Sequence, residues 1–507
     1  MTEAARPLAG VALFAAAVGL ALSNFIVLLD LTIANVSVPH IAGGLAVSAS
    51  QGTWVITSYA VVEAITVPLT GWLAARYGTV RWLVICLWGF GAASFLCGVA
   101  PSLDWLIGAR ILQGFFGGPL IPLTQALLVR IFPRERLPTA MGVWAVTSIV
   151  APILGPILGG WISDWLSWRW IFFINLPVIA LCLVPLLTLM PPFETERRRD
   201  PIDRVGLALL VISVGALQIL LDTGREHEWF ASTRIVLLAL VAGIGFAAFL
   251  IWEWYEPHPV VDLRLLRDRT LAVSSTVVAL GFGAFFGSVV LVPLWLQQFV
   301  GYTAEDAGLV MSFQGMLALV AAPFAAAAMH RFDVRWTVGL GLCWIAATTV
   351  LRLRWTSEAD FWTFALPQLL QGAGMPFFMM GLTALSVTTV RPDQVAAAAG
   401  IFNFLRTLAA AVGTAAATTL WYDGAKVMRG ELAPLLNAVP EQVGVLERLG
   451  LPPLSALALV EQLVEREAHT LAFLEVIALT VGVFLVAAAL MALIPRPPRG
   501  LAPMAGH

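Results

Sequence analysis

The chain has 507 residues, of which 59% are hydrophobic and only 12% are charged. A soluble globular protein carries roughly 25% charged residues, so this composition excludes an ordinary soluble domain and indicates a protein that crosses a membrane many times. The net charge of −2 excludes a strongly basic nucleic-acid-binding surface, and the four cysteines stand singly in apolar stretches, without the spacing of a metal site or a disulfide framework.

Apolar stretches bounded by charged residues, Pro or Gly predict fourteen membrane-spanning segments. Helices are predicted rather than strands because backbone polar groups in lipid must find hydrogen bonds within their own segment. The first segment is long and carries Asp30, which favours a retained span over a cleaved signal peptide. The predicted spans cover 10–39, 51–75, 80–100, 103–130, 138–162, 170–191, 204–222, 233–252, 271–299, 305–329, 336–351, 361–390, 395–422 and 470–494.

The basic residues of the connecting loops predict the orientation. With the N-terminus inside, eighteen of the twenty-nine Lys and Arg fall on the cytoplasmic side, so both termini are predicted to be cytoplasmic. The polar stretch that follows the sixth span predicts three regions: an N-terminal six-helix bundle over 1–195, a linker with two extra spans over 196–260, and a C-terminal six-helix bundle over 261–507. A long loop on the outer side of the membrane is predicted near 423–469 within the last of these.

The two six-helix blocks resemble each other. Leu112-Gln113-Gly114 recurs 258 residues later as Leu370-Gln371-Gly372, and Gly155 pairs with Gly413 at the same offset. Transporters built from two repeated halves place their sites near the membrane midplane between the halves.

A carboxylate inside the first span is the strongest functional signal. Asp30 stands in an apolar stretch, where a charge costs roughly 2.5–3.5 kcal/mol or more to insert. Glu63 in the second span and Arg110 in the fourth are predicted at similar depth. We interpret Asp30 and Glu63 as proton-binding groups tuned by Arg110; the alternatives are a static Asp30–Arg110 pair, an Asp30 that reaches water, and a Glu63 that matches the charge of a substrate.

Other polar residues in the spans are predicted to line a substrate cavity. For Arg406 the alternative is a packing role against helix carbonyls, and for Gln371 and Asn403 it is a helix–helix hydrogen bond. The predicted cavity residues are Asn35, Tyr59, Gln113, Gln371, Asn403 and Arg406.

The fifth span contains Ala151-Pro152-Ile153-Leu154-Gly155-Pro156-Ile157-Leu158-Gly159-Gly160. Small residues let helix backbones approach closely, and each proline frees a carbonyl, so this helix is predicted to act as a hinge or seal.

Motifs of other protein classes are absent from the sequence. No Gly-x-x-x-x-Gly-Lys-Ser/Thr phosphate loop, His-Glu-x-x-His or Gly-x-Ser-x-Gly occurs. We therefore expect no enzyme, no metal site and no cofactor, with protons as the coupling ion.

Several segments resemble one transporter family. Leu29-Asp30-Leu31-Thr32-Ile33-Ala34-Asn35-Val36 followed by Pro39, and Arg110-x-x-Gln113-Gly114, resemble first-span and fourth-span motifs of fourteen-span drug:proton antiporters in the major facilitator superfamily. Gly155-Pro156-x-x-Gly159-Gly160 resembles their fifth-span antiporter motif. Gly71-x-Leu73-x-x-Arg76-x-Gly78-x-x-Arg81 is similar to the superfamily loop between spans two and three, with Ala75 where the family often has Asp. Ser50–Ser58 and Trp170–Asn175 are similar to the EmrB type.

The resemblance implies an all-α major facilitator fold in the bacterial inner membrane that exchanges protons for lipophilic or amphipathic toxic compounds. It implies a periplasmic membrane-fusion adaptor and an outer-membrane channel as partners. The periplasmic loop 423–469 is the candidate docking surface, and the alternative is a solvated loop without a partner. The alternatives are a dedicated exporter of one metabolite, siderophore or toxin, and a transporter-like sensor or scaffold without flux. The gating residues that the resemblance implies are Gly71, Arg76, Gly78, Arg81, Pro152, Gly155, Pro156, Gly159 and Gly160.

Overall fold

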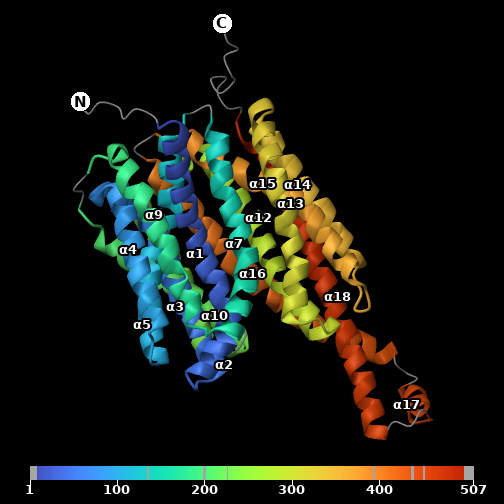
Figure 1. The fold of residues 1–507 in the computed structure, drawn as a ribbon. Coiled ribbons are helices and arrows are strands. Elements are labelled where there is room, and N and C mark those ends of the chain that lie inside the picture. Colours follow the sequence, from blue (N-terminus) through green and yellow to red (C-terminus); the bar gives the residue numbers. More distant parts are fainter. Residues whose placement is uncertain are drawn as a thin grey trace.

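The protein is a bundle of long helices (Figure 1). The computed structural model describes residues 8–133, 136–197, 201–224, 227–391, 394–435, 439–448 and 452–495, and every regular element within these ranges is helical. The prediction of an all-α membrane protein is confirmed.

Thirteen helices within the described residues are long and apolar enough to cross a membrane. The remaining predicted span, 138–162, falls on the 29-residue helix α7, which includes side chains outside the described part of the chain. Each of the fourteen predicted spans therefore has a helix at its position.

The helices of the first half begin and end as follows: α1 Gly10–Gly44, α2 Ala49–Gly52, α3 Trp54–Tyr77, α4 Thr79–Gly98, α5 Leu103–Gly117, α6 Leu120–Ile131, α7 Leu137–Trp165, α8 Trp170–Phe173 and α9 Asn175–Leu189. The middle of the chain forms η2 Pro191–Phe193, α10 Arg204–Thr223, η3 Trp229–Ala231, α11 Thr233–Tyr255 and η4 Leu263–Arg267. The second half forms α12 Arg269–Trp295, η5 Leu296–Val300, α13 Ala304–Arg331, α14 Val334–Val350, η6 Leu351–Arg354, α15 Phe361–Thr388, α16 Val395–Leu435, α17 Val439–Arg448, α18 Pro453–Leu490 and η7 Met491–Leu493.

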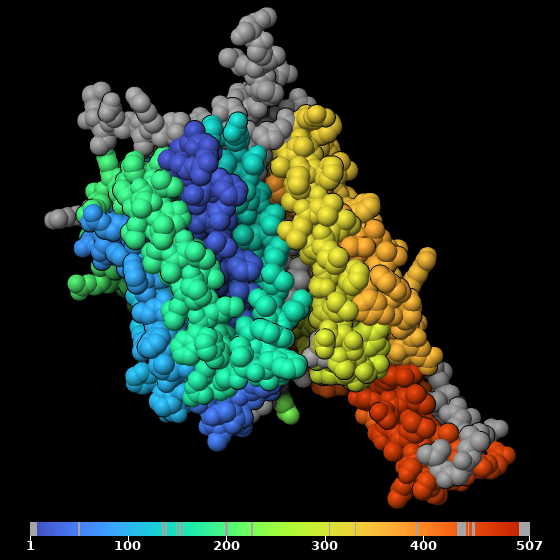
Figure 2. Space-filling view, viewed as in Figure 1, coloured from blue at the N-terminus to red at the C-terminus, as the bar shows by residue number. Residues whose placement is uncertain are grey.

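Two opposite faces of the bundle serve as reference. The terminal face is the one where α1 begins and η7 ends, and the distal face is the one that carries α2 and α17 (Figure 1). The two halves lie side by side, with α1–α9 on one side and α12–α18 on the other (Figure 2).

The fourth predicted span is a single membrane-spanning segment, Leu103–Ile131, built of two consecutive helices. Helix α5 ends at Gly117 and α6 begins at Leu120, with Gly118 and Pro119 between them. Glycines face α3 at this break: a Cβ on Gly114 would lie 2.6 Å from the Tyr59 carbonyl oxygen, and one on Gly117 would lie 2.7 Å from the Tyr59 hydroxyl. The absence of side chains here lets α5 pack directly on α3, which brings Arg110 to the centre of the first half.

The segment predicted as a loop near 423–469 is mostly helical. Helix α16 continues to Leu435, α18 starts at Pro453 and α17 lies between them, so both transmembrane helices extend beyond the bundle on the distal face (Figures 1 and 2). Arg429 on α16 stabilises this extension by ion pairs with Glu461 (2.7 Å) and Glu465 (3.5 Å) on α18. We name it the distal extension, comprising Asp423–Leu435, α17 and Pro453–His469.

Contacts between the halves are described near the terminal face. Gln125 on α6 donates to Ser386 on α15 (3.3 Å), and Asn403 on α16 donates to Gln125 (2.7 Å). Close packing accompanies these bonds, because a Cβ on Gly71 would lie 2.8 Å from Cα of Ala397. The halves are thus joined at the terminal side of the membrane-spanning region.

Candidate functional site

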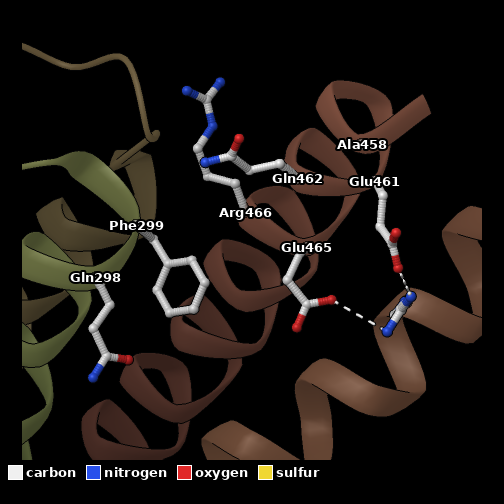
Figure 3. Close-up of a pocket in the computed structure, with 8 residues that line it drawn as sticks. Gln298, Phe299, Ala458, Glu461, Gln462, Glu465 and Arg466 are labelled. Carbon is white, nitrogen blue, oxygen red and sulfur yellow. Dashed lines mark hydrogen bonds and ion pairs between the residues drawn. The ribbon is translucent and has the colours of Figure 1, made fainter. Parts of the chain in front are cut away.

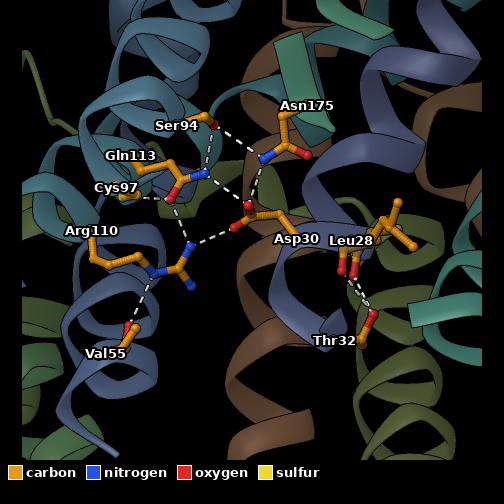
Figure 4. A network of polar contacts seen from close by, with 10 residues as sticks. Leu28, Asp30, Thr32, Val55, Ser94, Cys97, Arg110, Gln113 and Asn175 are labelled. Carbon is orange, nitrogen blue, oxygen red and sulfur yellow. Dashed lines mark hydrogen bonds and ion pairs between the residues drawn. The ribbon is translucent and has the colours of Figure 1, made fainter. Parts of the chain in front are cut away.

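Asp30 is the centre of a buried polar network in the first half (Figure 4). Its side chain is completely buried, and its carboxylate accepts three hydrogen bonds. Arg110 Nη1 donates to Oδ2 at 2.5 Å, while Gln113 Nε2 and Asn175 Nδ2 donate to Oδ1 at 2.8 and 2.7 Å. Helices α1, α5 and α9 therefore meet at one carboxylate.

Arg110 has a fixed orientation in this network. Its Nε donates to the Val55 carbonyl oxygen at 3.0 Å, and its Nη1 also donates to Gln113 Oε1 at 2.7 Å. The guanidinium carbon lies 4.2 Å from the centre of the Tyr59 ring, a cation–π contact that compensates a buried cation. A fully buried ion pair held by this many hydrogen bonds is a positioned group rather than a surface pair.

Asn175 and Ser94 complete the network, and no role for them follows from the sequence alone. Ser94 Oγ accepts from Gln113 Nε2 at 2.9 Å and from Asn175 Nδ2 at 3.1 Å. Asn175 is the last residue of the Trp170–Asn175 segment that resembles the EmrB type, and it is the first residue of α9. Cys97 also contacts the network, with Sγ 3.5 Å from Gln113 Oε1.

All three partners of Asp30 donate, so the carboxyl acts only as an acceptor, as an ionised carboxylate does. A protonated carboxyl would need to direct an O–H at an acceptor, and this would require Arg110 or an amide to move. The predicted pairing of Asp30 with Arg110 is present, and Gln113 binds this pair instead of standing alone as a cavity residue.

Glu63 and Arg406 form a second charged region, and Glu63 also interacts electrostatically with Arg110 and Asp30. Both are buried, Glu63 on α3 of the first half and Arg406 on α16 of the second, and they influence each other electrostatically. The Arg406 guanidinium carbon lies 5.1 Å from the ring centres of both Trp144 and Phe282. Its Nε and Nη1 have no hydrogen-bond partner among the described residues.

The other predicted cavity residues have different surroundings. Tyr59 is buried against Arg110, and Asn403 joins the halves through Gln125. Asn35 is exposed and lies outside the buried network, and no hydrogen bond joins its side chain to any residue of the described ranges 8–133 and 136–197.

Gln371 belongs to a buried polar cluster around Arg352, a residue that no sequence motif indicated. Arg352 Nη2 donates to Gln368 Oε1 at 2.5 Å and to Gln371 Oε1, which also accepts from Gln314 at 2.9 Å. Gln371 Nε2 donates to Thr349 at 3.0 Å. Arg76-Tyr77 resembles Arg331-Phe332 at a second repeat offset of 255 residues, and this offset maps Cys97 onto Arg352.

Two predicted gating residues, Gly71 and Gly78, occupy positions that require glycine. Gly71 lies against Ala397 of the other half, and Gly78 has a φ of +92°. A Cβ on Gly78 would also lie 2.6 Å from the carboxylate of Glu194, which accepts from Val80 N and Arg81 N at 3.0 Å each. Glu194 thus caps α4 with a carboxylate from the segment after α9. Arg76 contacts the Trp72 ring at 5.5 Å, and Arg81 is exposed.

Gly155 and Gly159 seat α7 on α1 close to Asp30. A Cβ on Gly155 would lie 2.7 Å from Cβ of Thr32, and one on Gly159 would lie 2.8 Å from the Ile33 carbonyl oxygen. A Cβ on Gly160 would meet nothing within 4 Å, so this glycine does not serve the contact. The side chains of Pro152 and Pro156 lie outside the described residues.

Within the described residues, no group of three or more His, Cys, Asp or Glu is placed to hold a metal ion. The chemistry of the site is therefore that of a carboxylate, an arginine and amides.

Comparison with known proteins identifies the family. Residues 20–414 match the Major Facilitator Superfamily. The chain belongs to this superfamily. It is therefore a multi-pass membrane protein with a major facilitator fold, as the sequence motifs predict.

Relatives within the superfamily match almost the whole chain. Multidrug export protein EmrB of Escherichia coli (strain K12) is 40% identical over 98% of both chains. Fatty acid resistance protein FarB of Neisseria gonorrhoeae is 40% identical over 82% of both chains. The resemblance to the EmrB type is confirmed.

A solved structure supports the fold. The human organic anion transporter MFSD10 matches with a TM-score of 0.59 over 94% of this chain and 99% of that chain, at 15% sequence identity. At this level of identity the likeness concerns the superfamily fold alone.

Proposed function

We propose that the protein is a proton-coupled antiporter that exports diverse lipophilic and amphipathic compounds across the bacterial inner membrane. The observation that carries the proposal is the fully buried Asp30 carboxylate, which three donors from α5 and α9 hold in place. Multidrug export is the activity named for the E. coli relative, which is 40% identical over nearly the whole length. Ionisable residues inside a membrane protein commonly mark ion pathways.

The coupling follows from the acceptor-only state of Asp30. To bind a proton, Asp30 must give up its hydrogen bond from Arg110 Nη1. Proton binding is therefore linked to a movement of α5 relative to α1. Gly155 and Gly159 pack α7 directly on α1 at Thr32 and Ile33, which transmits such a movement to the helix that faces the second half. Loading the proton thus favours one arrangement of the halves, and losing it favours the other.

Access to the two sides follows from the contacts between the halves. The arginine-rich loops lie on the terminal face, which we assign to the cytoplasm. The bonds from Gln125 to Ser386 and from Asn403 to Gln125 join the halves on that side. This conformation is closed toward the cytoplasm, the state in which an exporter releases its cargo and takes up a proton from outside.

The cargo region lies between Glu63 and Arg406. Arg406 stands between two aromatic rings and retains N–H groups without a partner among the described residues, which suits a flat apolar compound with a polar end. Glu63 contributes a buried carboxylate from the opposite half. Aromatic rings and two opposite charges can bind compounds of many different shapes, and they do not select for a single structure.

Replacing Asp30 by Asn tests the proposal. The amide preserves the shape but can neither bind nor release a proton, so we expect substrate-driven proton movement in proteoliposomes to fall at least about 100-fold, the scale on which removing one essential proton-transfer group acts. Retention of wild-type proton movement by Asp30→Asn would refute the assigned role. Glu63→Gln is the companion variant, and we expect it to change which substrates drive proton movement.

A second candidate function is export of one amphipathic acid. The relative named for fatty acid resistance and the buried, incompletely bonded Arg406 favour it. A toxicity panel of cationic, neutral and acidic compounds on expressing cells, with and without a protonophore, separates the two. Protection against several chemical classes supports multidrug export, and protection against acids alone supports the dedicated exporter.

We further propose that the distal extension docks a periplasmic membrane-fusion adaptor, which passes cargo to an outer-membrane channel. A pocket of about 480 Å³ opens on it, lined by charged residues of α16 and α18 and by Gln298 and Phe299 of η5 (Figure 3). Charge reversal at Glu461 and Glu465 should reduce co-purification of the adaptor while leaving the membrane bundle folded. Undiminished co-purification would count against docking at this surface.

A further inference from the structure

A lipid-facing groove lies where α10 and α11, the two helices between the halves in sequence, meet α3 of the first half. It has a volume of about 490 Å³ on the distal side of the bundle. Trp54 at the start of α3 and Ile219 near the end of α10 form one part of its wall. The rest comes from α11: Arg234, Leu237, Leu238 and Val241.

The α11 wall is a single stripe. Its four residues follow the spacing i, i+3, i+4 and i+7, which places them on one face over a length of about 10 Å. Only 17% of the most apolar part of α11 is buried, and Leu237 is 57% exposed, so this helix borders the hydrocarbon. The groove therefore opens to lipid rather than to the interior between the halves.

Arg234 places a cation at one end of this apolar stripe. It lies in the first turn of α11 and is exposed. Among the described residues, none forms a hydrogen bond or an ion pair with its side chain. Trp54, an aromatic residue typical of the membrane–water interface, lies at the same end of the membrane-spanning region. A guanidinium with free N–H groups binds phosphate oxygens in pairs.

We propose that this groove binds an anionic phospholipid, with the phosphate on Arg234 and an acyl chain along Leu237, Leu238 and Val241. Arg234 lies at the end of the groove where the phosphate headgroup would be, and the apolar stripe continues from it along the path of the acyl chain. The lipid would join α11, α10 and α3, which ties the two extra helices to the first half.

This placement connects the lipid to the Asp30 network. Trp54 directly precedes Val55, whose carbonyl oxygen receives the Arg110 Nε hydrogen bond. A lipid seated on Trp54 restrains the first turn of α3 and, through it, the orientation of Arg110. That consequence for transport rests on the proposed function, whereas the binding itself does not.

Native mass spectrometry of the purified full-length protein, titrated with phosphatidylglycerol or phosphatidylcholine, tests the site. One cationic contact with an anionic lipid is worth about 1 kcal/mol, so Arg234→Gln should weaken phosphatidylglycerol binding about fivefold. Arg354→Gln is the matched control, because Arg354 is an exposed arginine on the distal side that does not line the groove. Leu238→Trp fills the apolar stripe while keeping Arg234 and should also reduce binding.

Equal phosphatidylglycerol binding by the wild type, Arg234→Gln and Leu238→Trp would overturn the proposal. Equal binding of phosphatidylcholine and phosphatidylglycerol by the wild type would also overturn it, because the groove would then accept any apolar chain, cargo included. Asp30→Asn should bind phosphatidylglycerol like the wild type, which separates failure of this site from failure of the transport mechanism. Melting temperatures of all variants confirm that each remains folded.

Discussion

The two halves of the molecule build similar buried polar layers that differ in charge: the first contains an acid–arginine pair, and the second contains an arginine with no acid among the described residues. In the first half, Arg110 and Gln113 donate to the carboxylate of Asp30, and Ser94 accepts from Gln113. At the repeat offsets of 258 and 255 residues, the second half has Gln368, Gln371 and Thr349. These three surround no acid among the described residues; Arg352 bonds to both glutamines, and Ser288 stands 258 residues after Asp30.

Under the proposed function, the proton chemistry belongs to the first half. A carboxyl group can bind and release a proton, whereas arginine and amide side chains keep their charge state at physiological pH. The second layer contains one permanent cation, Arg352, which donates to the side-chain oxygens of Gln368 and Gln371. The packing beneath the two layers is nevertheless equivalent, since Gly155 seats α7 on α1 and Gly413, 258 residues later, seats α16 on α12.

The largest contrast is expected from replacing each arginine by methionine. Arg110→Met leaves the buried Asp30 carboxylate without its counter-charge, which should destabilise the protein by about 3–5 kcal/mol. Arg352→Met removes a buried cation that has no acid partner among the described residues, so it should be neutral or stabilising. Melting temperatures in one detergent measure both.

Equal destabilisation by the two substitutions would show that the layers do not differ in the way described. Arg352→Met should also retain proton-coupled transport, whereas Arg110→Met should lose it.

The equivalence of packing is tested by alanine at three glycines. A Cβ on Gly155 would lie 2.7 Å from Thr32 Cβ, and one on Gly413 would lie 2.7 Å from Gly283 Cα, so each alanine forces two helices apart. We expect each to cost about 1–3 kcal/mol and to slow transport. Gly160→Ala is the control, because its Cβ meets nothing within 4 Å and alanine favours a helix.

If Gly155→Ala and Gly160→Ala have the same melting temperature and flux, the close approach of α7 to α1 is not required. A defect in Gly155→Ala without one in Gly413→Ala would limit the close-packing requirement to the first half.

The smallest expected effect concerns the caps of α5 and α15. Ser102 accepts from Trp105 N at 3.4 Å, and at the same repeat position Asp360 accepts from Thr363 N at 3.3 Å. The hydrogen bond from the Thr363 hydroxyl lowers the pKa of Asp360 below its ordinary value. A group with a depressed pKa stabilises the fold above its unfolded pKa and loses this contribution as the pH falls through its folded pKa.

Asp360→Ser should therefore be slightly less stable than the wild type at neutral pH, and the difference should shrink as the pH falls below the ordinary range of an aspartate. Melting curves from pH 7 downward measure it, with Ser102→Ala as a pH-independent comparison. A difference that stays constant with pH would show that the Asp360 charge does not contribute.

The fold and the centre of the site follow from sequence to different extents. Span number and helix positions are predictable because hydrophobic length determines them. The Asp30–Arg110 pair is predictable because two opposite charges at the same depth in an apolar medium are strongly stabilised by forming an ion pair. Asn175 and Arg352 are not, because their contacts depend on how each helix is rotated about its axis.

Asn35 and the distal extension show two further limits. A polar residue five positions after Asp30 lies about 140° around the helix from it, and Asn35 is accordingly exposed rather than part of the network. Charged residues after Tyr422 suggested a loop, yet Arg429 pairs with Glu461 and Glu465 across two helices, and these pairs support helical structure outside the membrane.

Helix α16 has a mechanical consequence for any protein bound at the distal extension. Its 41 residues form one helix about 60 Å long, which packs on Gly71 of the first half through Ala397, passes Arg406 and ends at Leu435. A rotation of about 5° at its first turns moves its far end by about 5 Å over this length. Any rotation of α16 at its contact with the first half is therefore amplified along the helix and displaces the distal extension by several times more than the contact itself.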